Sequence, residues 1–237
     1  MTFKDRIIRI NELLIDHFGI PKRQKKLPNP IDTLIATILS QNTNDKNSYK
    51  AYHNLKQKFN SWEEVADLSR VQLEKVIRVA GLGKQKSAAI KASLTSLKKQ
   101  IGKIDLHHIK YMKDEDIVNE LTSIKGIGVK TASCVLLFSL NRNICPVDTH
   151  VHRTLNRIGI VNTTTPDKTF HQINKYLPEG IAHQFHTNLI NLGREVCKPA
   201  KPLCSVCPLL SECKFKHKNI EKVASVNSQR FLLLDSI

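Results

Sequence analysis

Four cysteines near the C-terminal end constrain this chain more than any other feature of its sequence. Cys197, Cys204, Cys207 and Cys213 have the spacing C-x6-C-x2-C-x5-C. Four thiolates this close together can surround one tetrahedral metal ion or one cubane iron–sulfur cluster. Residues 4 to 6 are charged and no apolar secretory signal follows them, so we expect an intracellular protein with reduced cysteines. The cysteine run therefore predicts an inorganic site rather than disulfides.

The chain is also strongly basic. Its 237 residues include 37 Lys and Arg against 21 Asp and Glu, a formal net charge of +16. Such a charge favours a polyanionic partner, above all nucleic acid, with a merely solvated surface as the alternative. The basic residues are bunched, and we expect Lys86, Lys198 and Lys201 to contact phosphates. No apolar stretch is long enough to span a bilayer, so we expect a soluble, cytoplasmic protein without a membrane partner.

Apolar residues recur with a helical period along almost the whole chain. One set shares a single helix face: Ile31, Leu34, Ile35, Ile38 and Leu39. The same spacing recurs at 71–79, 88–97, 117–124, 129–140 and 149–158. No segment sustains the alternation of apolar and polar residues that marks a strand. The sequence therefore predicts an all-α fold.

Two glycines mark a tight turn between two of these helices. Gly126 and Gly128 lie within Leu-Thr-Ser-Ile-Lys-Gly-Ile-Gly-Val-Lys-Thr-Ala, residues 121–132. Glycine permits backbone angles that are closed to other residues, so two helices can meet within very few residues. The second helix would then present free N–H groups at its start, which suit a phosphate. The pattern resembles a helix-hairpin-helix DNA-binding motif.

Lys130 falls in the first turn of the second helix. As an ordinary hairpin lysine it would contact a phosphate. As a nucleophile it would act as the free amine, which the positive end of the helix dipole and partial burial both favour over the ammonium. A free amine can attack C1′ of a deoxyribose and form a Schiff base. The hairpin alone leaves both roles open.

Asp148 comes directly before the helical segment 149–158. One role for it is the N-cap, in which its carboxylate accepts hydrogen bonds from the free N–H groups of the next turn. Another is catalysis: a carboxylate facing Lys130 across a cleft could stabilise positive charge on the sugar and help to deprotonate the amine or the released water. The two roles are compatible.

The three landmarks occur in a fixed order: Gly-Ile-Gly-Val-Lys-Thr-Ala, then Val-Asp-Thr-His, then the cysteine run. In this order they closely resemble the endonuclease III family of helix-hairpin-helix DNA glycosylases, over roughly residues 5–213. The resemblance implies an all-α, two-domain fold with a DNA-binding cleft between a six-helix barrel and a cluster domain. It also implies a [4Fe–4S] cluster on the four cysteines, Lys130 as the Schiff-base lysine and Asp148 as the catalytic aspartate.

On this resemblance we divide the chain into two domains and a tail. The expected bounds are 23–142 for the barrel, about 114–132 for the helix-hairpin-helix motif, 1–22 with 143–215 for the cluster domain, and 197–213 for the cluster loop. We expect residues 216–237 to form a loosely held basic tail. An extra helix packed on the body is the alternative.

Two further segments resemble the family. The turn at 81–83 echoes the hairpin turn and matches a loop that wedges into the duplex, which makes Leu82 the expected wedge, with ordinary packing as the alternative. An apolar wedge offsets part of the cost of unstacking a base. In the segment 40–45 the family often has a glutamine that fills the gap left by the flipped base. Asn42 falls on that position and Gln41 lies beside it, so the sequence leaves open which residue fills the gap.

Together these positions predict a monomeric, bifunctional DNA glycosylase with AP-lyase activity on damaged double-stranded DNA. We expect it to remove oxidised or ring-saturated pyrimidines, with Lys130 displacing the base and β-elimination cleaving the strand. The nearest alternative is a monofunctional glycosylase for mismatched thymine, uracil or adenine; such enzymes resemble this chain but lack the lysine. An alternative of another class is a non-catalytic DNA-binding module with structural zinc on the four cysteines.

Overall fold

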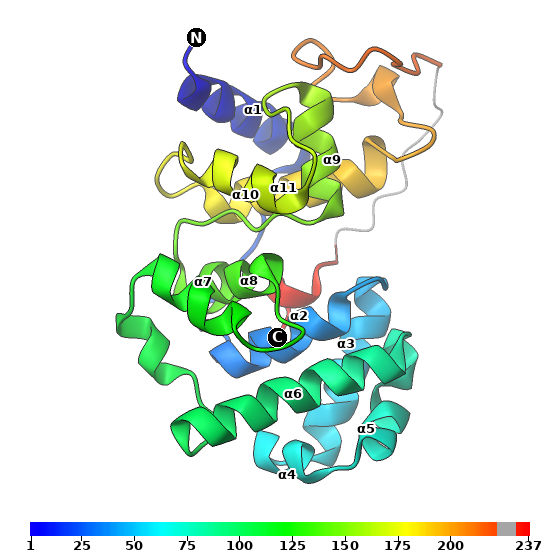
Figure 1. Cartoon of the computed structure of the whole chain (residues 1–237). Helices are drawn as coiled ribbons and strands as arrows, with labels where there is room; N and C mark the ends of the chain where they lie inside the picture. The colour runs from blue at the N-terminus through cyan, green and yellow to red at the C-terminus, as the bar shows by residue number, and fades with distance from the viewer. Residues whose placement is uncertain (222–230) are drawn as a thin grey trace. The chain divides into compact units, whose positions relative to one another are not determined.

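The computed structural model describes residues 1–221 and 231–237, and every regular element in these ranges is helical (Figure 1). The all-α prediction is confirmed. The chain divides into two compact units. Unit one comprises Met1–Arg23 and Arg142–Arg230, and unit two comprises Gln24–Asn141 and Phe231–Ile237. No helix within the described ranges has the length and apolar character needed to cross a membrane.

Unit two is built around α2, an almost completely buried helix. Its elements are α2 (Pro30–Ser40), α3 (Asp45–Lys58), α4 (Trp62–Asp67), α5 (Arg70–Ile77), α6 (Gly83–Ile101), α7 (Asp114–Thr122) and α8 (Val129–Leu140), with 3-10 turns η1 (Arg78–Ala80) and η2 (His107–Tyr111). Asn29 caps α2 by accepting a hydrogen bond from the Ile31 N–H, and Pro30 occupies its first position. Because α2 packs against α3, α6 and α8, its apolar residues form the core of the unit.

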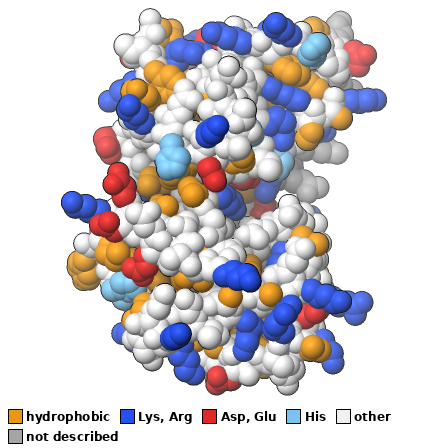
Figure 2. All heavy atoms as spheres, in the orientation of Figure 1, with side chains coloured by type: hydrophobic (Ala, Val, Ile, Leu, Met, Phe, Trp, Pro, Cys, Tyr) orange, Lys and Arg blue, Asp and Glu red, His pale blue; other side chains and the backbone are white. Residues whose placement is uncertain are grey.

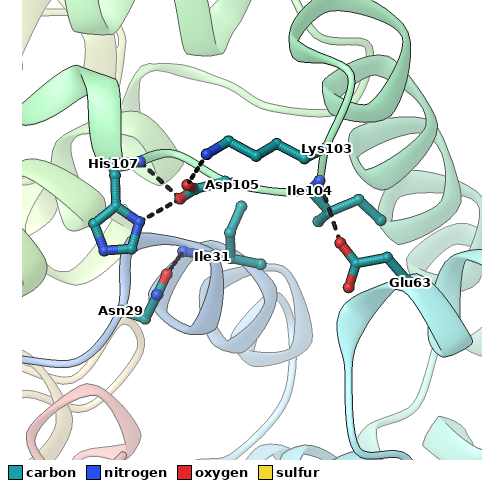
Figure 3. A network of polar contacts seen from close by, with 7 residues as sticks. All are labelled: Asn29, Ile31, Glu63, Lys103, Ile104, Asp105 and His107. Atoms are coloured by element: carbon teal, nitrogen blue, oxygen red, sulfur yellow. Dashed lines mark hydrogen bonds and ion pairs between the residues drawn. The ribbon is translucent and has the colours of Figure 1, made fainter.

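The segment directly after α6 carries a polar network (Figure 3). Asp105 pairs with Lys103 (3.0 Å) and accepts hydrogen bonds from the backbone and ring of His107. Burial alone would raise the pKa of Asp105, but these hydrogen bonds and the charge of His107 hold it well below its usual range. The Ile104 N–H donates to Glu63 of α4 (3.3 Å). This bond ties the segment after α6 to α4.

Unit one contains the remaining helices. They are α1 (Phe3–Phe18), α9 (Thr149–Ile158), α10 (Pro166–Asn174) and α11 (Ala182–Asn191), followed by a π turn η3 (Leu192–Val196) and a 3-10 turn η4 (Cys204–Val206). α11 lies against α1 and α9, and its Phe185 is fully buried. The π turn continues α11 directly into the segment that carries the four cysteines.

The end of the chain differs from the expected loose tail. Phe231–Ile237 belong to unit two, where the turn η5 (Leu233–Asp235) contacts α2 and α3, and Leu233 is 1% exposed. The ring of Phe231 meets Tyr49 edge-on at 5.4 Å. Burial of these apolar side chains holds the segment on unit two, so the prediction of a loose tail is wrong there. Residues 216–221 have no regular element, but they are hydrogen-bonded to the cysteine loop, since the Cys204 N–H donates to the Asn219 carbonyl (3.1 Å) and the Ser205 hydroxyl to the Glu221 carbonyl (2.7 Å). Residues 222–230 fall outside the described ranges.

Candidate functional site

The predicted hairpin forms in unit two between α7 and α8. Gly126 has φ +95°, and a Cβ there would lie 3.1 Å from the Cβ of Ala89 in α6, so this position requires glycine. Ile127 is 5% exposed and packs inside the hairpin. Gly128 has φ −101°, which any residue can adopt, and a Cβ there would meet open space. The expectation that both glycines use angles closed to other residues is therefore corrected: only Gly126 does.

The helix α8 begins without a side-chain cap. Gly128 is its N-cap residue, so no side chain satisfies the first backbone N–H groups, and they remain available to a ligand. The helix dipole adds partial positive charge at this end. Lys130 lies in the same turn, is half-exposed, and its ammonium makes no hydrogen bond or ion pair with any described residue. The turn thus presents both anion-binding groups and an unpaired amine.

The loop after α2 lies beside this turn. The Gln41 Nε2 atom is 3.5 Å from Thr131 Oγ1 at the start of α8, a long hydrogen bond. Asn42 is exposed and adopts a left-handed conformation with φ +50°. Gln41 is thus engaged with the residue that follows Lys130, whereas the Asn42 side chain is exposed.

Leu82 is also exposed and left-handed. Its side chain is 45% exposed and its φ is +49°, and it forms the N-cap position of α6 without any side-chain hydrogen bond. A left-handed conformation costs a non-glycine residue roughly 1–2 kcal/mol. Leu82 therefore combines a partly exposed apolar side chain with a left-handed backbone.

Lys86 does not lie where the sequence predicted. Its side chain is 2% exposed, and its Nζ donates hydrogen bonds to the carbonyl oxygens of Leu39 (2.8 Å) and Ala80 (2.7 Å). Burial lowers the pKa of Lys86 to about 8. The prediction that Lys86 contacts a DNA phosphate is wrong, because its amine faces backbone carbonyls inside unit two.

Asp148 lies in unit one, where it caps α9. Its Oδ1 accepts a hydrogen bond from the Val151 N–H at 2.8 Å, which confirms the N-cap role, and its side chain is half-exposed. Burial lowers the pKa of the neighbouring His150, while the charge of Asp148 acts in the opposite direction. Asp148 is therefore held in one orientation at the start of a helix.

Two polar residues that the sequence did not single out fix the segment leading to Asp148. The Asn174 side chain accepts a hydrogen bond from the Cys145 N–H (2.7 Å) and donates one to the Cys145 carbonyl (3.0 Å). His186 is buried and donates from Nδ1 to the Pro146 carbonyl (2.9 Å). Each is an isolated polar residue in a helical pattern, so no sequence motif signals its role.

The cysteine run forms a loop that two arginines of α9 hold in place. Arg153 donates to the carbonyls of Cys197 (3.0 Å) and Gly193 (2.7 Å). Arg157 donates to the carbonyls of Lys198 and Pro199, each at 2.7 Å. These bonds satisfy backbone carbonyls at the start of the cysteine loop and in the π turn before it.

The four thiols lie close enough together to interact electrostatically. Burial raises the pKa of Cys207 to about 12, and the like charges of the three other cysteines of the run act in the same direction. A set of thiols that disfavour one another's ionisation fits a bound cationic centre, which would reverse that effect. No group of three or more His, Cys, Asp or Glu side chains in the described ranges has the arrangement of a closed metal site.

The surface around this loop is basic. Lys198 and Lys201 are exposed between the first two cysteines, and Arg157 stacks on Phe215 at 4.4 Å. A hollow nearby is lined by Asn156, Arg157, Lys214, Phe215, Lys216 and His217. Lys and Arg side chains are also common across the face seen in Figure 2, as the net charge of +16 leads one to expect. Such a surface suits phosphate groups.

Comparison with known proteins gives a consistent result. Residues 35–179 match the family described as HhH-GPD superfamily base excision DNA repair protein. The chain is 34% identical to Endonuclease III of Thermotoga maritima over 194 residues, which cover 81% of this chain and 86% of that protein. It is also 34% identical to Endonuclease III of Sulfolobus acidocaldarius over 207 residues, covering 83% and 86%. A solved non-covalent Endonuclease III–DNA complex is similar with a TM-score of 0.75 and 26% identity, covering 90% of this chain and 96% of that one.

Proposed function

The chain belongs to the endonuclease III family of HhH-GPD base excision repair DNA glycosylases, and we propose that it is bifunctional, acting also as an AP lyase. The observation that carries the proposal is Lys130, a half-exposed lysine whose amine is unpaired among the described residues, at the uncapped start of α8. An amine in this place is free to react, and the N–H groups beside it suit the phosphate next to the reacting sugar.

In the proposed reaction the Lys130 amine attacks C1′ of the damaged nucleotide. The bond between C1′ and the base breaks, and the base leaves with the bonding electrons and takes up a proton. The bond between C1′ and the ring oxygen O4′ then breaks, O4′ takes up a proton, and a Schiff base joins Lys130 to C1′ of the opened sugar. Loss of a C2′ proton then expels the 3′-phosphate by β-elimination, and water releases the lysine. Asp148 would stabilise the positive charge that develops on the sugar and assist the proton transfers.

The proposed substrates are oxidised or ring-saturated pyrimidines in duplex DNA. Leu82, exposed and left-handed, is the proposed wedge. Asn42 is the better candidate for filling the gap left by the flipped base, because its side chain is exposed while Gln41 contacts Thr131. The turn of Gly126 and Gly128 would bind the DNA backbone through N–H groups. Lys198 and Lys201, both exposed, would contact phosphates beside the cysteine loop.

We propose that the four cysteines hold a [4Fe–4S] cluster. Its chemistry would be structural: thiolate ligation fixes the basic loop that carries Lys198 and Lys201, and removal of the base needs no electron. Anaerobically purified protein should be coloured and contain about four iron atoms per chain. A colourless protein with one zinc per chain would contradict the cluster and favour a structural zinc site.

Borohydride trapping on duplex DNA with one abasic site tests the lyase. Borohydride reduces a Schiff base to a stable amine, so wild-type protein should form a covalent adduct and Lys130→Ala should form none. Lys125→Ala is the matched control, since Lys125 is an exposed lysine of the same hairpin turn and should retain the adduct. No adduct with wild type would favour the monofunctional glycosylase. An undiminished adduct in Lys130→Ala would place the Schiff base on another amine.

A panel of duplexes tests the substrate class. Each carries one defined lesion and one defined opposite base, and release of the base is measured separately from strand cleavage. Ring-saturated and oxidised pyrimidines should be released fastest. Preferential release of mismatched thymine, uracil or adenine would contradict the proposed substrates and leave the lyase result unaffected.

A further inference from the structure

Lys86 is a buried cation without an acidic partner. Its side chain is 2% exposed, and no carboxylate of the described residues forms an ion pair with it. Its two hydrogen-bond acceptors are backbone carbonyls, Leu39 in the last turn of α2 and Ala80 at the end of η1. A buried ammonium without a counter-ion disfavours folding unless carbonyl oxygens replace its hydration, so its presence here calls for a specific role.

The two carbonyls lie just before the two loops that the proposed function brings to DNA. Leu39 precedes the loop with Asn42, and Ala80 precedes the loop with Leu82. Asn42 and Leu82 are both exposed, and both are non-glycine residues with φ near +50°. Within the described ranges one other non-glycine residue, Asn141, has a positive φ. The lysine therefore joins the bases of two loops, each of which carries an exposed side chain on a residue with a positive φ.

The helix that carries Lys86 also supports the hairpin. Ala89 follows Lys86 by three residues in α6, and it is the residue against which Gly126 packs at close range. Just beyond the far end of α6, beside the network around Asp105, the Ile104 N–H donates to Glu63 of α4 (Figure 3). One helix thus contacts the hairpin turn through Ala89 and the bases of both loops through Lys86.

We propose that Lys86 is a positioning residue that holds the Leu82 loop and the Asn42 loop at a fixed separation, so that wedge and gap-filler enter one duplex together. The inference rests on the proposed function, in which both side chains act on the same base pair. A wedge that unstacks a base and a side chain that replaces it succeed only when their spacing matches the duplex. Loops without the tie would have to be ordered during binding, which lowers the rate of duplex opening.

Three variants test the proposal. Lys86→Met keeps the length of the side chain but removes the donors. Lys91→Met is the matched control, because Lys91 lies on the same helix and also donates to two backbone carbonyls, those of Ala66 and Leu68, before a segment with no proposed DNA contact. Lys86→Arg keeps donors for both carbonyls. If Lys86→Met does not fold, Lys86→Gln replaces it, because the shorter amide cannot reach both acceptors.

The fluorescence of 2-aminopurine placed opposite the lesion measures the rate of duplex opening. Borohydride trapping on a single-stranded abasic oligonucleotide measures the chemical step, because that substrate needs no opening. Lys86→Met should slow the fluorescence change by about tenfold or more and leave trapping within about twofold of wild type. Lys91→Met and Lys86→Arg should open the duplex within about threefold of the wild-type rate.

Equal opening rates for Lys86→Met and Lys91→Met would overturn the proposal. So would an equal loss of opening and trapping in Lys86→Met, since that pattern indicates general damage to unit two. A wild-type protein that opens the duplex but forms no adduct would refute the lyase alone, and the opening rates would still decide the role of Lys86.

Discussion

Unit two contains two Gly-x-Gly turns that look alike in sequence and behave in opposite ways. In the turn 81–83 the middle residue, Leu82, is 45% exposed and takes a left-handed conformation itself. In the turn 126–128 the middle residue, Ile127, is 5% exposed, and Gly126 takes the left-handed conformation. The first turn has a positive φ at both Gly81 and Leu82 and exposes the side chain of Leu82, whereas the second has a positive φ at Gly126 and buries the side chain of Ile127.

The lysines that follow the two turns show the opposite pattern of exposure. Lys86, after the first turn, is buried and bonded to two carbonyls, and Lys130, after the second, is half-exposed with its amine unpaired among the described residues. One turn therefore presents an apolar side chain and uses its lysine as an internal tie. The other presents N–H groups and an amine. The shared Gly-x-Gly motif specifies a tight turn between two helices, and the residues around it determine which groups the turn exposes.

The largest effect expected from this comparison concerns the middle residues. Ile127→Ala should lower the free energy of unfolding by about 3 kcal/mol, because it removes a buried side chain and leaves a cavity. Leu82→Ala should change it by less than about 0.5 kcal/mol but should slow base release from duplex DNA. Urea unfolding and single-turnover assays measure the two quantities. Similar stability losses in both variants would contradict the contrast between the turns.

The next effect concerns the glycines. Gly126→Ala should cost about 1–2 kcal/mol of stability through its left-handed backbone, with a further loss from the contact with Ala89. Gly128→Ala should leave stability within about 0.5 kcal/mol, because its backbone angle is ordinary and the space is open. Its methyl group would nevertheless stand at the start of α8, so duplex affinity should fall. Urea unfolding measures the stability of the two variants, and fluorescence anisotropy with a labelled duplex measures their affinity for DNA. Equal destabilisation of Gly126→Ala and Gly128→Ala would refute the prediction.

The sequence predicted those features that depend on local spacing. Helical periodicity gave the all-α class, the glycines gave the hairpin, and the position of Asp148 before an apolar helical pattern gave its N-cap bond. It did not predict the place of Lys86, which looked like one of several surface lysines. Its burial depends on Leu39, 47 positions away along the chain, and a one-dimensional pattern carries no information about such a contact.

The same reasoning explains the other differences between expectation and structure. Asn174 and His186 act on a backbone segment about 30 to 40 residues earlier, where no motif links them to Asp148. The final residues, Phe231–Ile237, read as the apolar end of a basic tail, yet they complete the core of a unit whose other residues end at Asn141. Long-range packing decides each of these positions, and composition does not reveal it.

The last expected effect concerns the proton on the buried lysine. Burial lowers the pKa of Lys86 from an ordinary 10.5 to about 8 in the folded protein. Between these pH values the unfolded chain binds more protons than the folded one, so the free energy of unfolding should rise with pH by at most about 1.4 kcal/mol per unit. Below pH 8 both states are protonated, and this contribution becomes constant.

Lys86→Met lacks the titrating group, so the difference in unfolding free energy between wild type and variant isolates it. Urea unfolding of both proteins at intervals from pH 7 to 10 should give a difference that is flat up to about pH 8 and then moves in favour of wild type. A difference that stays flat would show that the carbonyls of Leu39 and Ala80 hold the proton on Lys86 despite burial. The Lys86 side chain that joins the two loops would then be charged. If instead the difference in unfolding free energy rises with pH, the neutral amine, which still has two N–H donors, binds both carbonyls at high pH.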